Sequence, residues 1–129
     1  MNNISASEKK WMQSFAIIDV AFWLLIFGGC ALNADGCLES ISGVPVVIYA
    51  PFWLLLSPLW NILPKNPLFT ATLLVIVGFC GHILIGWLMG RILQNRSVRW
   101  YVSIPASFVV LFLLVNIAWV SAYMLGMIR

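Results

Sequence analysis

Asp19 and His82 are the side chains best able to do chemistry inside the long apolar stretches of this chain. A charged aspartate at the centre of a membrane helix costs about 2.5–3.5 kcal/mol on insertion scales, so it is expected to be neutral, paired or hydrated. Asp19 therefore has two interpretations, a carboxylate that handles protons or ions and an assembly contact to a neighbouring helix. His82 is interpreted as a packed, hydrogen-bonding histidine, with a single axial haem ligand as the alternative.

The rest of the chain offers few partners for catalysis. It holds four acidic residues, one histidine and three cysteines. It lacks an H-E-x-x-H zinc motif, a glycine-rich phosphate loop and a C-x-x-C pair. We therefore expect no enzyme activity, no resident metal and no cofactor. The net charge of +3 is divided among small basic groups beside apolar segments, a pattern that does not indicate nucleic-acid binding.

The cysteines allow one structural hypothesis. Cys30 and Cys37 flank a predicted turn at 33–36, and they can form a disulfide if that turn faces an oxidising compartment. Redox chemistry at this pair is the alternative. Cys80 lies within an apolar segment and is interpreted as a small buried hydrophobe.

The elements that must position these groups are membrane helices. Hydrophobic residues make up 63% of the 129 residues and charged residues 9%, against about 45–50% and 25% in soluble domains. About 20 apolar residues span the hydrocarbon of a bilayer. We predict spans at about 11–32, 68–93 and 101–128, within a single all-helical membrane domain that covers residues 1–129.

The segment 41–63 is uncharged and long enough to span, but Pro45, Pro51 and Pro58 interrupt it. A proline inside a helix removes a backbone hydrogen bond and kinks the helix. The segment is therefore either a kinked fourth span or a re-entrant or interfacial hairpin. We favour three spans plus the hairpin and keep four spans as the alternative.

Basic residues favour the same choice, because they prefer the cytoplasmic side of the membrane. With three spans, five basic residues are cytoplasmic and two are not, whereas four spans give four and three. The five are Lys9, Lys10, Arg91, Arg96 and Arg99, and the other two are Lys65 and Arg129. The cytoplasmic group can also bind anionic lipid headgroups.

Depth supplies a second argument. At 1.5 Å per residue, Asp19 lies about 12 Å below Trp11 and His82 lies about 13 Å from Arg91. With three spans both distances start from the same interface, so the two side chains are at one depth. With four spans His82 is about 21 Å from the cytoplasmic side and out of register. We therefore predict that Asp19 and His82 contact each other.

Helix packing is indicated by small residues around His82. Gly78, His82, Gly86 and Gly90 recur every four residues and form one face of a helix. The small residues Gly86 and Gly90 permit the close approach of another helix. Asn116 is expected to donate a further hydrogen bond between helices.

Three hypotheses of function follow. The leading one is a small multi-pass inner-membrane protein, of the accessory, immunity or defence type, that acts by helix association with itself or with a partner membrane protein. The stripe from Gly78 to Gly90 is its expected association surface. The second is a small oligomeric pore, holin-like or ion- or proton-translocating, that uses Asp19. The third is a redox or haem-bearing anchor subunit that uses His82 or the pair Cys30 and Cys37.

Overall fold

The computed structural model describes residues 4–32, 44–94 and 98–127. In chain order the helices are α1 (Ala6–Leu32), α3 (Val44–Ile48), α4 (Ala50–Leu56), the 3-10 turn η1 (Ser57–Leu59), α5 (Pro67–Ile92) and α6 (Trp100–Met124). Three of them, α1, α5 and α6, are long and apolar enough to cross a membrane. The chain is therefore a multi-span helical membrane protein, as its composition predicts.

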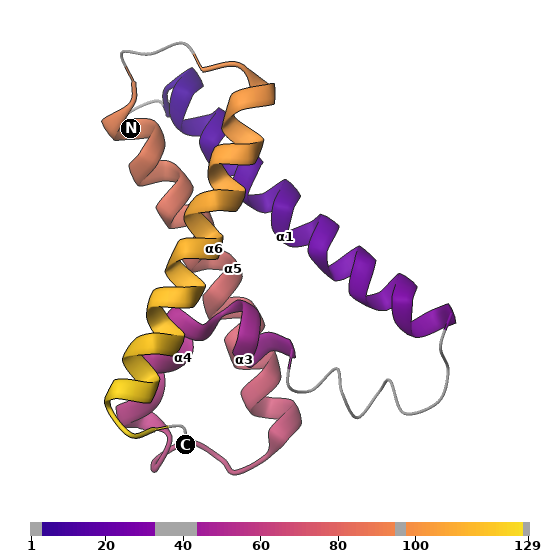
Figure 1. Cartoon of the computed structure of the whole chain (residues 1–129), viewed down its shortest axis with the longest axis vertical. Coiled ribbons are helices and arrows are strands. Elements are labelled where there is room, and N and C mark those ends of the chain that lie inside the picture. Colours follow the sequence, from indigo (N-terminus) through magenta and orange to yellow (C-terminus); the bar gives the residue numbers. More distant parts are fainter. Residues whose placement is uncertain (1–3, 33–43, 95–97, 128–129) are drawn as a thin grey trace.

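The proline-rich segment does not form a fourth span. Helix α3 has 5 residues and α4 has 7. At 1.5 Å per residue these helices rise only about 8 Å and 11 Å, far short of the roughly 30 Å of hydrocarbon. They meet at Tyr49 as a helical hairpin beside the long helices (Figure 1). The prediction of three spans plus a hairpin is confirmed.

The prolines explain why this segment is broken into pieces. Pro45, Pro51 and Pro58 are each the second residue of α3, α4 and η1 respectively. In a first helical turn the missing N–H of proline has no helical partner to lose, so proline starts a helix there and ends the one before it. Three prolines spaced six or seven residues apart therefore give three short helical pieces.

The start of α1 and the end of α6 lie about one turn from the approximate bounds expected for the first and last spans. Helix α1 begins at Ala6 instead of Trp11, because Ser5 and Glu8 form a reciprocal capping box: the Ser5 N–H donates to Glu8 Oε2 (2.6 Å) and the Glu8 N–H to Ser5 Oγ (3.2 Å). The box extends the helix without a break into the predicted span.

Helix α6 ends at Met124, short of the predicted end at 128. Gly126 has a positive φ of 69° and closes the helix. Its N–H donates to the Tyr123 carbonyl, and the Met127 N–H donates to the Ala122 carbonyl, both at 3.0 Å. This pair of bonds is a Schellman motif, for which glycine is suited because it has no Cβ.

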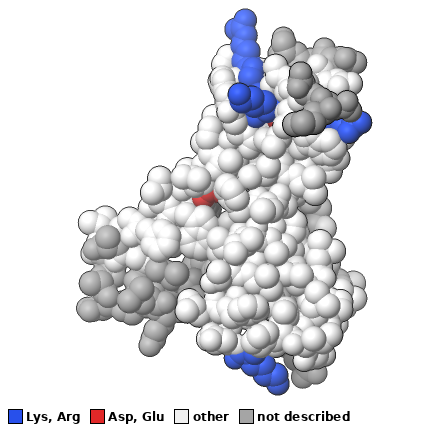
Figure 2. Space-filling model, turned by 180° about the vertical axis from the view of Figure 1, so that it is seen from behind, with Lys and Arg blue, Asp and Glu red and all other residues white. Residues whose placement is uncertain are grey.

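The helix ends lie at two opposite ends of the molecule. The Lys10 ammonium donates to the Val98 carbonyl (2.6 Å), so the start of α1 lies beside the turn between α5 and α6. Lys65 lies in the turn between η1 and α5, at the opposite end of the molecule (Figure 1). Figure 2 shows Lys and Arg side chains at both ends, separated by a belt without them.

Helix α1 packs on the other long helices along its first half only. Trp11, Phe15 and Leu111 form the buried core of this contact. The C-terminal half of α1 projects away from α5 and α6 (Figure 1). Most side chains from Val20 to Gly29 are exposed, including Leu24 at 67% and Leu25 at 74%.

Candidate functional site

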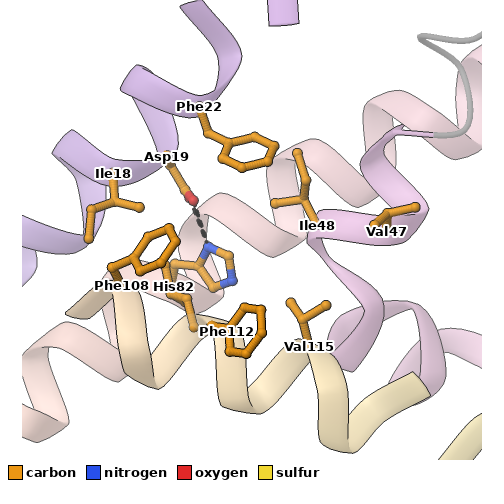
Figure 3. Close-up of a pocket in the computed structure, with 10 residues that line it drawn as sticks. Ile18, Asp19, Phe22, Val47, Ile48, His82, Phe108, Phe112 and Val115 are labelled. Carbon is orange, nitrogen blue, oxygen red and sulfur yellow. Dashed lines mark hydrogen bonds and ion pairs between the residues drawn. The ribbon is translucent and has the colours of Figure 1, made fainter. Parts of the chain in front are cut away.

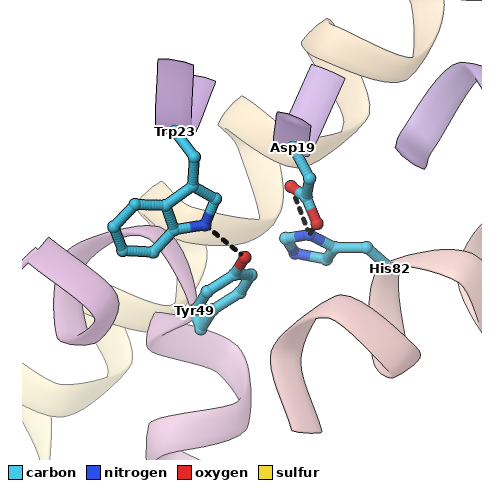
Figure 4. Close-up of polar contacts among 4 residues, drawn as sticks. All are labelled: Asp19, Trp23, Tyr49 and His82. Atoms are coloured by element: carbon cyan, nitrogen blue, oxygen red, sulfur yellow. Dashed lines mark hydrogen bonds and ion pairs between the residues drawn. The ribbon is translucent and has the colours of Figure 1, made fainter. Parts of the chain in front are cut away.

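Asp19 and His82 lie against each other where α1 crosses α5, at the contact that their matching depths predicted. His82 Nδ1 is 2.9 Å from both oxygens of the Asp19 carboxyl group (Figure 4). Each side chain is only 2% exposed. Burying one such group alone is unfavourable in hydrocarbon, so each side chain supplies the partner that makes the other tolerable.

The glycine stripe of α5 makes this contact possible. Gly78, His82, Gly86 and Gly90 are all buried on one face. A Cβ on Gly86 would lie 2.9 Å from both Met12 Cα and the Trp11 carbonyl oxygen, which are backbone atoms of α1. One on Gly90 would lie 2.8 Å from the Glu8 nitrogen. The stripe thus lets α1 approach closely enough for Asp19 to reach His82.

The hairpin adds a second polar contact to the site. Tyr49, at the junction of α3 and α4, is fully buried, and its ring centroid lies 5.2 Å from that of His82. Trp23 of α1 donates from Nε1 to the Tyr49 hydroxyl oxygen (3.0 Å; Figure 4). Gly78 faces the Tyr49 ring, so this glycine accommodates the hairpin whereas Gly86 and Gly90 accommodate α1.

A cavity of about 160 Å³ adjoins the pair. Asp19 and His82 are its polar lining residues, and the rest of its wall is apolar (Figure 3). Among the wall residues are Phe22 of α1, Ile48 of α3 and Phe112 of α6. The second ring nitrogen of His82, Nε2, points away from Asp19 toward Phe112 and Val115 (Figure 3).

Two serines join α1 to α6, and a third bonds within α6. The hydroxyls of Ser14 on α1 and Ser103 on α6 share a hydrogen bond (2.9 Å), and both side chains are fully buried. The Ser107 hydroxyl donates to the Ser103 carbonyl. Sequence reasoning missed the Ser14–Ser103 and Trp23–Tyr49 contacts. Both contacts join residues that are distant in sequence. Matching depths in the membrane linked Asp19 to His82, but no such comparison pointed to these two pairs.

Asn116 contacts no second helix among the described residues, so the predicted hydrogen bond between helices is not found there. Its side-chain amide is exposed and donates to the Phe112 carbonyl of its own helix (2.7 Å). A carbonyl one turn back is always within reach of such a side chain, so no second helix is needed to satisfy it.

The cysteines differ from one another. Cys80 is a free thiol and is exposed, so its assignment as a buried hydrophobe is wrong. Cys30 is disulfide-bonded, and Cys37 lies outside the described residues. A Cys30–Cys37 bridge therefore stays a prediction.

The basic residues lie where a headgroup layer would be. Arg91 stacks on Trp87 (5.2 Å from its guanidinium carbon to the ring centroid), and Lys10 lies over Trp100 (5.9 Å). The Arg99 guanidinium donates to the Tyr101 hydroxyl (3.3 Å). Lys9 is exposed, and Arg96 lies outside the described residues. Basic and aromatic side chains gathered at one end of apolar helices are typical of a membrane interface.

The described residues contain no group of three or more His, Cys, Asp or Glu side chains that could hold a metal ion. What the site offers is a buried acid–imidazole pair, one imidazole nitrogen directed away from the acid, and a small apolar cavity beside it. Comparison with models of protein families, with curated proteins and with solved structures finds no match.

Proposed function

We propose that this protein acts in the bilayer by helix association, and that the projecting half of α1 is the part that associates. The observation that carries the proposal is the divergence of the C-terminal half of α1 from α5 and α6 (Figure 1). The polar contacts of Ser14 and Asp19 fix the first half of α1 to the rest of the chain, and Trp23 adds one near the start of the second half. The second half, residues 20–32, contains no charged residue and is mostly exposed; we call it the α1 arm.

The glycines of α5 and α1 support the division of α1 into a packed first half and an exposed second half. Each glycine of α5 has a described in-chain neighbour that a Cβ would strike. Gly28 and Gly29 of α1 have no described atom within 4 Å of such a Cβ. Glycine in a helix interior costs about 1 kcal/mol relative to alanine, and close packing of a neighbour is the usual compensation in membrane helices. Among the described residues, the arm has no neighbour that compensates this cost.

The glycine stripe on α5 is not the partner surface. Gly78, Gly86 and Gly90 do pack against helices, as their spacing predicted, but those helices are α1 and the α3–α4 hairpin of the same chain. The partner surface proposed here is instead the α1 arm.

A second copy of the chain is the proposed partner. Ala21 and Gly28 are seven residues apart, so they lie on one face of the α1 arm, where two such helices can approach closely. A shallow groove lined by Ala16, Ile17, Val20, Ala21 and Leu24 runs beside this face. Small residues on one face leave room for the same face of a second copy, which is the arrangement of a two-fold dimer.

The test is energy transfer between donor- and acceptor-tagged copies in vesicles at low protein density. We expect transfer above the random-proximity level, reduced to less than about half by Ala21→Leu or Gly28→Leu because leucine blocks close approach. Cys80→Leu is the matched control, since it also enlarges an exposed small residue, but on α5. Background transfer for the native protein, or no effect of the arm variants, would overturn the proposal.

The other hypotheses have less support. Asp19 is paired and 2% exposed, which is not the position of a carboxylate that lines a water-filled pore. The cavity beside His82, at about 160 Å³, is smaller than the roughly 300–1,000 Å³ of pockets that hold drug-sized ligands, so haem does not fit it. We propose an inner-membrane location, with the Lys10 and Arg99 end in the cytoplasm, and no enzyme activity.

A further inference from the structure

We propose that the cavity beside His82 binds the carbonyl-bearing single ring of a membrane-soluble molecule, such as a lipophilic aryl ketone or quinone. This site is separate from the association surface on the α1 arm. Four features carry the inference: the size of the cavity, its wall, its access and the proton on its one free polar atom.

The size matches one ring. The cavity measures about 160 Å³, and an apolar cavity of about 150 Å³ in a protein core is known to accept benzene. The wall suits an aromatic guest, because Phe22, Phe108 and Phe112 supply rings for stacked or edge-on contact.

Access is from the lipid. The side chains of Phe22, Phe108 and Phe112 are 42%, 54% and 59% exposed. These residues belong to the apolar middle portions of α1 and α6, the two helices between which the cavity lies (Figure 3). A ligand that enters there must already be dissolved in the bilayer.

The free polar atom of the cavity wall is Nε2 of His82, and it is expected to be a hydrogen-bond donor. A net charge is strongly disfavoured in hydrocarbon, so the Asp19–His82 pair is expected to be neutral overall. Two proton arrangements are neutral: carboxylate with imidazolium, and carboxylic acid donating to Nδ1 of neutral imidazole. In both of them Nε2 carries a proton. No described residue accepts a hydrogen bond from Nε2, so an acceptor on the ligand is needed, and a carbonyl oxygen provides one.

The chain offers a clean reporter, because His82 is its sole histidine. Protein labelled with ¹⁵N-histidine, freed of any affinity tag and placed in lipid nanodiscs, shows the two ring nitrogens of His82 alone. We expect Nε2 to carry a proton in the free protein. Titration with 4′-butylacetophenone should move the Nε2 signal, and butylbenzene, which lacks the carbonyl, should move it far less. One hydrogen bond corresponds to an affinity ratio of about tenfold.

Val115→Phe is the variant that tests the cavity, because it fills the space and leaves the Asp19–His82 pair in place. It should abolish the ketone-induced shift. Val109→Phe is the matched control, since Val109 is on the same helix, is 52% exposed and does not line the cavity. An unprotonated Nε2, equal responses to the ketone and the hydrocarbon, or unchanged binding in Val115→Phe would each overturn the proposal.

Discussion

The contact between Asp19 and His82 shows how two unfavourable residues become compatible with a membrane interior. Either residue alone leaves a polar group without a partner where water is scarce. Together, at 2.9 Å and 2% exposure, they satisfy each other at Nδ1. The pair therefore has a structural role whether or not the cavity beside it binds a ligand.

A double-mutant cycle tests this role. We expect Asp19→Leu and His82→Leu each to destabilise the protein by about 3–5 kcal/mol, because each leaves an unpaired buried partner. The double variant should lose less than the sum, with a coupling of about 0.5–3 kcal/mol. Unfolding by SDS from mild detergent micelles measures the three values. Pairing Asp19→Leu with Asn116→Leu is the control and should be additive, because the described hydrogen bond of Asn116 lies within α6.

Tyr49 is the residue through which the hairpin reaches the site. Tyr49→Phe removes the hydrogen bond from Trp23 and should cost about 0.6 kcal/mol, the average for such bonds in membranes. Tyr49→Ala also empties the space between Gly78 and His82 and should cost about 3 kcal/mol or more. The same SDS unfolding measurement separates the two, and equal losses would mean that the ring is not packed as described.

At the scale of elements, α5 is the helix on which the other parts assemble. Its glycines accept the backbone of α1 at one end and the rings of Tyr49 and Phe52 toward the other. A glycine stripe could be recognised in the sequence, but the sequence does not say whether it packs within one chain or between two. That choice depends on how α1 crosses α5, which is a property of the whole fold.

Substitution of two glycines separates intrachain from interchain packing. Gly86→Leu should destabilise the monomer by at least about 1–3 kcal/mol, since its side chain meets the α1 backbone at Met12. Gly28→Leu should leave monomer stability unchanged or raised, because leucine is the better helix former and no described atom is in the way. Thermal unfolding in detergent at concentrations that keep the protein monomeric measures both. Equal stability of the two variants would contradict the assigned packing.

Much of the arrangement of the helices could be predicted from the sequence, and the reasons can be named. Apolar length alone located the three spans, and charge distribution together with depth placed His82 beside Asp19. The capping box at Ser5 and Glu8 and the Schellman glycine Gly126 are local signals that set where α1 begins and α6 ends. The cavity and the burial of Tyr49 were beyond prediction, because they arise where α1, the hairpin and α6 meet and no local pattern encodes that meeting.

At the scale of the whole molecule, one belt without Lys or Arg separates two ends that carry them (Figure 2). The hydrogen bond from Lys10 to Val98 fixes the start of α1 to the α5–α6 turn. Because these two points lie at the same end of the molecule, the chain must cross the membrane an even number of times between them. Helices α1 and α5 supply two crossings, and the short hairpin between them supplies none.

Sided labelling tests this arrangement directly. In a variant without native cysteines, single cysteines at Ile4 and Gln94 should react with a membrane-impermeant maleimide from the same side, and one at Lys65 from the opposite side. All three positions are exposed and lie outside the long apolar stretches of the spans. A fourth span through residues 44–63 would put Ile4 on the side of Lys65 and opposite Gln94. That labelling pattern would refute the hairpin, and with it the meeting of Tyr49, Asp19 and His82 at one depth.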